Sequence, residues 1–183
     1  MSVWPITVVP PLPVIQTWSM EALGIELMTI QRDLSAIGST TVPAANRAFY
    51  IPFMLAMPIV VTRLWWENGG TVSGNVDVGI YDSVGTRIVS TGATAGSGTI
   101  AIQSVDITDT LIGPGRFFLA ISCSSATATL MATTDAPSLE ALRSRGAFNQ
   151  ETAHPLPATA TFATVISSFI PVVGLLVYPR TVV

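Results

Sequence analysis

The residues able to do chemistry are few in this sequence and lie far apart. It contains one histidine, His154, and one cysteine, Cys123. A serine nucleophile needs a neighbouring base, but the single histidine precedes Pro155 in an expected loop and no GxSxG elbow is present. One histidine and one cysteine form a zinc site only if carboxylates complete it. The sequence therefore predicts no enzyme activity, no metal and no cofactor, and it favours a buried structural thiol at Cys123.

Acidic residues offer the next candidate chemistry. Asp77 and Asp82 in DVGIYD, like Asp106 and Asp109 in DITD, could give oxygen ligands to calcium. No loop of the EF-hand type surrounds them, and aspartate is common in turns. We interpret all four as turn or strand-end aspartates and leave calcium binding open. Glu67 with Asp77 or Asp82 could also form a carboxylate pair at glycosidase spacing, a distance that sequence does not set.

The sharpest candidate for binding is the run Trp65-Trp66-Glu67-Asn68. Neighbouring side chains of a strand point to opposite faces, so we expect one tryptophan to face the core and the other to face outward. An outward tryptophan beside Glu67 or Asn68 could stack on a sugar ring, anchor a subunit interface, or be covered by protein. Tyr81 lies at an outward position of the hairpin 72–92 and has the same alternatives.

Charge is scarce in this chain. Charged residues make up 10% of it, against about a quarter in ordinary domains, while 49% of the residues are hydrophobic. A surface so poor in charge is typical of a protein covered by a partner subunit. All 8 basic residues are arginines without a cluster, and the net charge is −3. The composition thus indicates self-association and argues against binding to nucleic acid.

Residues 1–18 are predicted to form an extended, proline-rich arm. Its four prolines fix φ and favour polyproline II. No basic residue precedes Arg32, so we do not expect a signal peptide. Because the arm is too apolar for a solvated tail, we expect it to contact neighbouring subunits. The expected contact residues are Trp4, Pro5, Ile6, Val8, Val9, Leu12, Val14 and Ile15.

A connecting segment, 19–45, is ambiguous between helix and strand. Apolar residues within it recur at steps of four and three, which is helical spacing, at Leu23, Leu27, Ile30, Leu34 and Ile37. Ser19 could begin such a helix and Gly38 could end it. Gly24 weakens the pattern. We favour a short helix over 19–37, with a strand as the close alternative.

Residues 46–183 show the pattern of an all-β domain with a C-terminal strand or arm. About eight short stretches alternate apolar and polar residues between turns rich in Gly, Asn, Asp and Pro. This pattern is typical of an antiparallel β-sandwich of the jelly-roll type. A change of parity after Ile102 predicts a bulge near Gln103-Ser104.

Two further stretches of this domain need an assignment. SLEALRSRG predicts one or two helical turns that begin at Ser138 and end at Gly146. The uncharged stretch 162–178 is near the minimum length of a membrane span. Pro171 and Gly174 interrupt it, so strands are favoured there over a membrane helix.

Four segments together resemble a group of tailed-bacteriophage virion proteins with a jelly-roll domain. They are NRAFYIPFML, VTRLWWENGGTVSGNVDVGIYDSVGTRIVSTG, DITDTLIGPGRFFLAIS and HPLPATATFAT, and the resemblance covers roughly residues 46–178. It lies in the style of the sequence and includes no catalytic signature. The resemblance implies head-decoration proteins, fibre proteins or tail-associated adhesins, often assembled as trimers. The arm lies outside it.

These observations lead to one leading hypothesis and one alternative. The leading hypothesis is a virion structural protein, a capsid decoration or cement-like homotrimer assembled in the bacterial host cytoplasm. Its partners would be its own copies and other virion proteins such as the major capsid protein. The arm and the C-terminal segment 162–183 would pack on neighbours. The alternative is a receptor- or glycan-binding module of a phage tail or head fibre, with a host-surface glycan as ligand.

Overall fold

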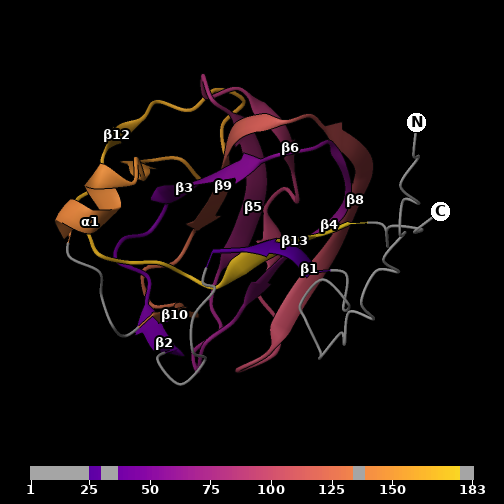
Figure 1. Cartoon of the computed structure of the whole chain (residues 1–183). Helices are drawn as coiled ribbons and strands as arrows, with labels where there is room; N and C mark the ends of the chain where they lie inside the picture. The colour runs from indigo at the N-terminus through magenta and orange to yellow at the C-terminus, as the bar shows by residue number, and fades with distance from the viewer. Residues whose placement is uncertain (1–24, 30–36, 134–138, 178–183) are drawn as a thin grey trace, which may run out of the picture.

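The computed structural model of the chain consists mostly of antiparallel β-strands, with one short helix among the residues it describes (Figure 1). These residues are 25–29, 37–133 and 139–177. Two sheets pack on each other as sandwich-like layers, and a small two-stranded sheet lies beside them. The predicted all-β sandwich is confirmed at this level.

The larger sheets differ in size and in the strands at their edges. The four-stranded sheet has the order β1 (Ile25–Met28), β13 (Val173–Val177), β4 (Ile59–Glu67) and β8 (Ile102–Ile112). The seven-stranded sheet has the order β12 (Ala163–Thr164), β11 (Phe148–Gln150), β3 (Ala48–Leu55), β9 (Gly115–Cys123), β5 (Asn75–Asp82) and β6 (Arg87–Ser90), and β7 (Thr94–Ala95) also pairs with β5. The two-stranded sheet pairs β10 (Thr129–Thr133) with β2 (Ile37–Thr41).

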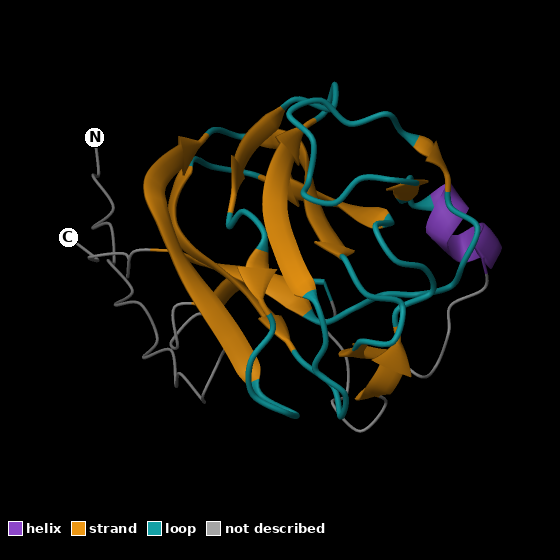
Figure 2. Ribbon diagram, turned by 180° about the vertical axis from the view of Figure 1, so that it is seen from behind, coloured by secondary structure: helices purple, strands orange, loops and turns teal. Residues whose placement is uncertain are grey.

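The main core lies between the two larger sheets, because their strands alternate in hydrophobicity. On β5, the inward residues Val76, Val78 and Ile80 are at most 2% exposed. They share one cluster with Leu64 and Trp66 of β4. Figure 2 shows that strands make up the body of the molecule, with the helix at one end. The alternation of apolar and polar residues in β5 therefore correctly predicts which of its side chains face the core.

The helix favoured over 19–37 is wrong where the structure can test it. Residues 25–28 form β1, which pairs with β13, and Ile37 begins β2. Pairing with an apolar strand satisfies the backbone of this segment better than a short isolated helix, which is marginal in water. Ser19, Leu23 and Leu34 lie outside the described residues.

The predicted bulge exists, but it lies further along β8. Pairing with β4 is continuous from Ile102 to Asp106. The register then shifts, since Arg63 pairs with Asp106 while Val61 pairs with Thr110. The change of parity therefore falls between Asp106 and Thr110 and not at Gln103-Ser104. As a result Ile102 faces outward, 62% exposed.

The short helix is confirmed as α1, Leu139–Ser144. It ends as predicted at Gly146, whose φ is 75°. The amide of Gly146 donates to the carbonyl of Arg143, and that of Ala147 donates to Leu142, which is the pattern of a Schellman C-cap. The expected first residue, Ser138, lies outside the described residues.

The C-terminal stretch does not behave as an arm up to residue 177. Strand β13 lies inside the four-stranded sheet, paired with β1 and β4, and its Val173 and Leu175 are fully buried. The expectation that 162–183 packs on neighbouring subunits is thus wrong for β13, because its own sheet takes both of its edges. In the part of the chain that the structure describes, no helix has the length and apolarity needed to cross a membrane.

Candidate functional site

The run of two tryptophans is entirely inside the protein. The two side chains do point to opposite faces of β4, and they join different apolar clusters. Trp66 is fully buried in the main core and its Nε1 donates to Asn68 Oδ1 at 2.9 Å. The Asn68 amide donates in turn to the Ser97 carbonyl and to Gln103 Oε1. These residues therefore stabilise the end of β4, and none of them offers a free ring or amide.

Trp65 faces the outer side of the four-stranded sheet, but it is covered as well. It is 3% exposed and packs against Val172, with Ile37, Met131, Ile170 and Leu176 around them. Its Nε1 has no hydrogen-bond partner among the described residues. The expectation that one tryptophan is open to stack on a sugar ring is wrong, because strands β13 and β10 and the residues before them cover this position.

Tyr81 occupies the outward position predicted for it, yet it is also fully buried. Its hydroxyl donates to the Pro157 carbonyl at 2.5 Å, and its ring meets Tyr50 edge-on at 5.2 Å. Burial raises the pKa of Tyr81, and burial likewise raises the pKa of Tyr50 to about 12. Both phenols therefore stay protonated, and Tyr81 acts as a donor to the chain that covers it.

That cover is a stretch we call the covering segment, residues 153–162. It lies on the outer face of the seven-stranded sheet and joins Tyr50, Tyr81 and Phe118 in a second apolar cluster. Backbone bonds hold it along its length. They run from Ala153 N to Asn46 O (2.6 Å), from Arg87 N to Ala158 O (2.9 Å) and from Ala160 N to Gly85 O (2.8 Å). The chain thus supplies its own third layer over this sheet.

A notch in the sheet receives the centre of the covering segment. Leu156 is 2% exposed, and it sits over Gly79, the outward residue in the middle of β5. A Cβ on Gly79 would lie 3.0 Å from Leu156 Cδ1 and 2.9 Å from the Val89 carbonyl oxygen. Glycine in a strand interior often marks such a close approach, so this position carried a signal that the sequence reasoning passed over.

Asp77 is the buried polar residue that orders this site. It is fully buried, and its Oδ2 accepts the backbone N–H of Leu156 at 2.9 Å while Oδ1 accepts the Thr91 hydroxyl at 3.2 Å. Arg87 Nη1 donates to the carbonyl of the same Leu156. Burial raises the pKa of Asp77, and the bonds from Leu156 and Thr91 and the charge of Arg87 oppose that rise. The interpretation of Asp77 as a turn aspartate is wrong, because it lies in mid-strand.

The other predicted aspartates are placed differently. Asp82 is a turn aspartate as expected, since its Oδ1 accepts the amides of Val84 and Thr86. Asp106 and Asp109 lie inside β8, so their interpretation as turn or strand-end aspartates is wrong, and Asp106 lies 3.5 Å from Arg63 on the outer side of the strand. Within the described ranges, no three of the His, Cys, Asp and Glu residues come together in a way that could hold a metal ion.

A serine, the histidine and an aspartate meet beneath the covering segment. Ser122 Oγ lies 3.0 Å from His154 Nδ1, and Asp77 pairs across the strands with Ser122. Burial lowers the pKa of His154, while the nearby Asp77 carboxylate works against that lowering. The ring is therefore neutral near pH 7.

This cluster lacks the geometry of a catalytic triad. A triad presents Nε2 to the serine and holds Nδ1 with the carboxylate. Here the ring presents Nδ1, and its Nε2 is buried with no partner among the described residues. Ser122 is 2% exposed, and both Asp77 oxygens bind other groups. The arrangement fixes the covering segment and does not activate a nucleophile.

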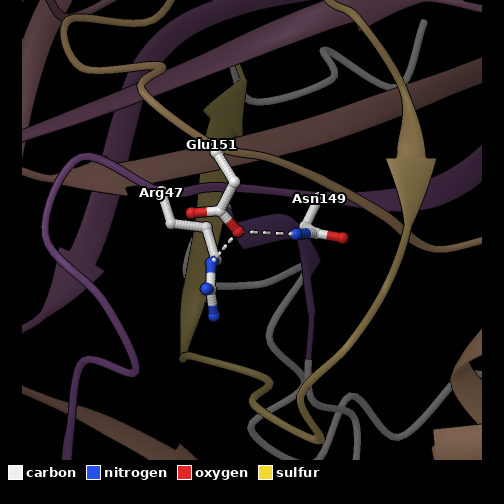
Figure 3. Close-up of polar contacts among 3 residues, drawn as sticks. All are labelled: Arg47, Asn149 and Glu151. Carbon is white, nitrogen blue, oxygen red and sulfur yellow. Dashed lines mark hydrogen bonds and ion pairs between the residues drawn. The ribbon is translucent and has the colours of Figure 1, made fainter.

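An ion pair stands just before the covering segment (Figure 3). Glu151 Oε1 accepts from Arg47 Nε at 2.6 Å and from Asn149 Nδ2 at 3.3 Å. Figure 3 shows both donors converging on one carboxylate oxygen, with the Asn149 oxygen directed away from it. The Arg47 side chain is 14% exposed and that of Glu151 is 54% exposed. Solvent screens such a half-exposed pair, so its contribution to stability is modest.

Cys123 is buried as predicted, and burial raises the pKa of its thiol. Its Sγ contacts the Ser73 carbonyl at 3.8 Å. A protonated, buried thiol is inert towards most reagents. This residue therefore packs in the main core.

The open part of the molecule lies elsewhere, along β8. This strand is an edge of the four-stranded sheet and forms one margin of the sandwich (Figure 1). Its outward residues include Ile102, 62% exposed, and Leu111, 69% exposed. Other strongly exposed apolar residues are Met54, Met57, Val84, Ile100 and Ile166. The arm residues predicted to contact neighbours, from Trp4 to Ile15, lie outside the described residues.

Comparison with known proteins gives this chain no relative: no protein-family model, no curated protein and no solved structure matches it.

Proposed function

We propose that this protein is a structural component of a bacteriophage virion. In this proposal it is a decoration or cement-like protein with a jelly-roll domain, and it stabilises an assembly through contacts between subunits. It forms a homotrimer and also contacts other virion proteins such as the major capsid protein. The resemblance in style of sequence to jelly-roll virion proteins supports this assignment, and the all-β sandwich is compatible with it.

The observation that carries the proposal is the open edge strand β8. It is 11 residues long, and among the described residues nothing pairs with its outer edge. Its outward Ile102 and Leu111 are each more than 60% exposed. A long edge with exposed apolar residues invites another chain, and proteins that avoid association blunt such edges. A surface of this kind supports an assembly function.

The polar groups best suited to chemistry also support a structural role. Asp77, Arg87 and Tyr81 all bind the covering segment, which belongs to the same chain. His154 and Ser122 bind each other beneath it. Groups already committed to internal hydrogen bonds contribute to folding and leave little for a substrate.

Burial of apolar surface is a sufficient source of energy for this function. At about 25 cal/mol per Å², burying about 1,000 Å² of apolar surface between subunits contributes about 25 kcal/mol before the costs of association and ordering. With 10% charged residues, the chain has few charges to desolvate on association. The proposed contacts can therefore hold an assembly without a specific polar lock.

The alternative of a glycan- or receptor-binding module has lost the residues on which it rested. Trp65, Trp66, Asn68 and Tyr81 are at most 3% exposed, and Glu67 is half-buried. Sugar binding by aromatic stacking requires an open ring face. We therefore keep the assembly function as the only proposal.

Light scattering on the full chain tests it. We expect a mass close to three times the 19.2 kDa of one chain. Leu111→Asp places a charge on the open surface and should shift the equilibrium towards monomer. Val84→Asp is the matched control, since Val84 is 77% exposed at the tip of the β5–β6 turn, away from β8. A monomer at every concentration would contradict the proposal.

A further inference from the structure

The four edges of the two larger sheets are unequal. Strands β1 and β6 have 4 residues each and β12 has 2, whereas β8 has 11. Short edge strands give a foreign strand little to pair with, so three of the edges are blunt. Strand β8 contains no proline, and the other devices that protect an edge, its two aspartates and its shift of register, lie from Asp106 onward. It is the longest of the four edges of the two larger sheets.

The usable part of this edge is its first half. Between Ile102 and Asp106, β8 pairs with β4 without interruption, opposite Glu67 to Arg63. The shift of register beyond Asp106 bends the strand and ends the regular ladder. A strand added here would form a ladder of about 17 Å, from five residues at about 3.4 Å each. The acceptor is therefore the outer edge of residues 102–106.

The occupant must suit the charges of this edge. Asp106 lies in it and Asp109 follows. A second β8 would bring two more carboxylates to this edge, whereas an uncharged or positive occupant would bring none.

The N-terminal segment of the chain has the required composition. Its first acidic residue is Glu21 and its first basic residue is Arg32, so residues 1–20 carry no charged side chain. Between Pro5 and Pro10 stands the run Ile-Thr-Val-Val, residues 6–9, which is rich in β-branched side chains. Such residues favour strands, and the flanking prolines limit pairing to this run. Its four residues fit within the five-residue acceptor.

The geometry of the sheet allows this run to reach a β8 edge. The segment joins the fold at Ile25, the start of β1, on the opposite edge of the same sheet. The chain from Val9 to Ile25 spans at most about 50 Å when extended. The sheet is about 14 Å wide over three strand spacings. The run can therefore extend past its own domain to an adjacent copy.

We propose that residues 6–9 of one copy add as a β-strand to the free edge of residues 102–106 in a neighbouring copy. The inference rests on the proposed function, because it needs copies of the chain to associate. Main-chain hydrogen bonds would supply the affinity, and the alternating side chains of the run would cover the exposed Ile102. A donor on one side of the domain and an acceptor on the other give a head-to-tail contact, and such a contact forms a ring, for example a trimer, when the rotation between copies closes.

Cross-linking between two full-length variants tests this contact. Thr7→Cys and Ser104→Cys carry tags of different mass and are mixed, then treated with a short bis-maleimide linker. Ser104 is exposed, and the native Cys123 is buried and so should not react. We expect a linked product that contains one copy of each variant. Replacing Ser104→Cys by Ser83→Cys, an exposed serine in the β5–β6 turn, should abolish it.

Every outcome of the experiment decides the question. A link that forms only within the double variant Thr7→Cys/Ser104→Cys, and not in the mixture, would show that the run pairs with its own β8 and would overturn the proposal. An oligomer by light scattering without any link would overturn the proposal and leave the assembly function standing. A monomer that forms no link would end both.

Discussion

The two larger sheets of this protein treat their outward sides in opposite ways. The seven-stranded sheet is covered by residues 153–162 of its own chain, so that outward residues such as Tyr81 and Asp77 are fully buried. The four-stranded sheet is covered around Trp65 but remains open along β8, where Ile102 and Leu111 are exposed. One side is completed within the chain, and the other ends in a free edge.

The two sides also differ in what their polar side chains bind. On the covered side, Asp77, Arg87 and Tyr81 each bind the backbone of the covering segment. On the open side, the visible ion pair joins Arg63 and Asp106 at 3.5 Å between two exposed side chains. Buried bonds specify a single position for a segment, whereas an exposed pair specifies little. The covered side is therefore fixed in one position, whereas the open side is left for the association that we propose.

Two leucines give the largest test of this contrast. Leu156→Ala removes a side chain that is 2% exposed in the covered side, and we expect it to lower the free energy of unfolding by about 2–5 kcal/mol. Leu111→Ala removes one that is 69% exposed on the open side, and we expect a change within about 0.5 kcal/mol for the monomer. Urea unfolding followed by tryptophan fluorescence measures both.

The two leucine variants should rank in the opposite order when association is measured in place of stability. Light scattering should find Leu156→Ala as associated as the parent wherever it is folded, and Leu111→Ala less so. Equal losses of stability in the two variants would mean that the covering segment is no better fixed than the open edge. That result would remove the contrast.

The sequence was sufficient to predict the sandwich but not what covers it. The alternation of Val76, Val78 and Ile80 identifies the inward face of β5, and the structure confirms it. The same alternation predicts only that Tyr81 points to the outer face of the sheet. Whether that side meets water, a partner or its own chain depends on a contact 76 residues away, at Pro157. Local periodicity contains no information on such a contact.

A second prediction compares two glycines. Gly79→Ala places a Cβ 2.9 Å from the Val89 carbonyl oxygen, a rigid backbone atom, and 3.0 Å from Leu156. We expect it to lower the free energy of unfolding by about 1–3 kcal/mol through overpacking. Gly113→Ala meets nothing within 4 Å, so we expect no loss, or a gain of up to about 1 kcal/mol from reduced freedom of the unfolded chain. Thermal unfolding of the two variants compares them directly.

The decisive result is which of the two glycine variants is the less stable. A Gly79→Ala protein as stable as the Gly113→Ala protein would show that Leu156 and the covering segment can move away without cost. The segment would then be a loosely attached loop, and the notch in β5 would have no structural purpose.

The candidate site was predicted less well than the fold, for an identifiable reason. Trp65 and Trp66 were correctly placed on opposite faces of one strand, but outward was equated with exposed. Asp77 was assigned to a turn because aspartate prefers turns, whereas burial with the Leu156 amide overrides that preference. A charged residue in the middle of an apolar strand, two positions from Gly79, was the available signal. Strand propensity alone counts an aspartate at this position as unfavourable and does not show that it binds the covering segment.

The smallest expected effect is the dependence of stability on pH. It arises on the covered side, from His154. His154 is the only histidine of the chain, and it belongs to the covering segment. Burial lowers its pKa in the folded protein, so the unfolded chain binds more protons just below pH 6.5. The stability that His154 contributes is therefore complete above about pH 6.5 and is lost as the pH falls through the folded-state pKa. The wild-type protein should become less stable from about pH 7 to about pH 5, and His154→Asn should depend less on pH.

Asp77 changes stability with pH in the opposite direction to His154. The His154→Asn variant is therefore the necessary control. Burial raises the pKa of Asp77, so its contribution is complete below the ordinary aspartate pKa of 3.8 and is lost as the pH rises through the raised value. Both proteins carry Asp77, so the difference between their stability curves reports the histidine together with its interaction with Asp77. Urea unfolding at a series of pH values gives the two slopes. A wild-type slope no steeper than that of His154→Asn would mean that the ring titrates as in the unfolded chain, and that the covering segment opens to water at this residue.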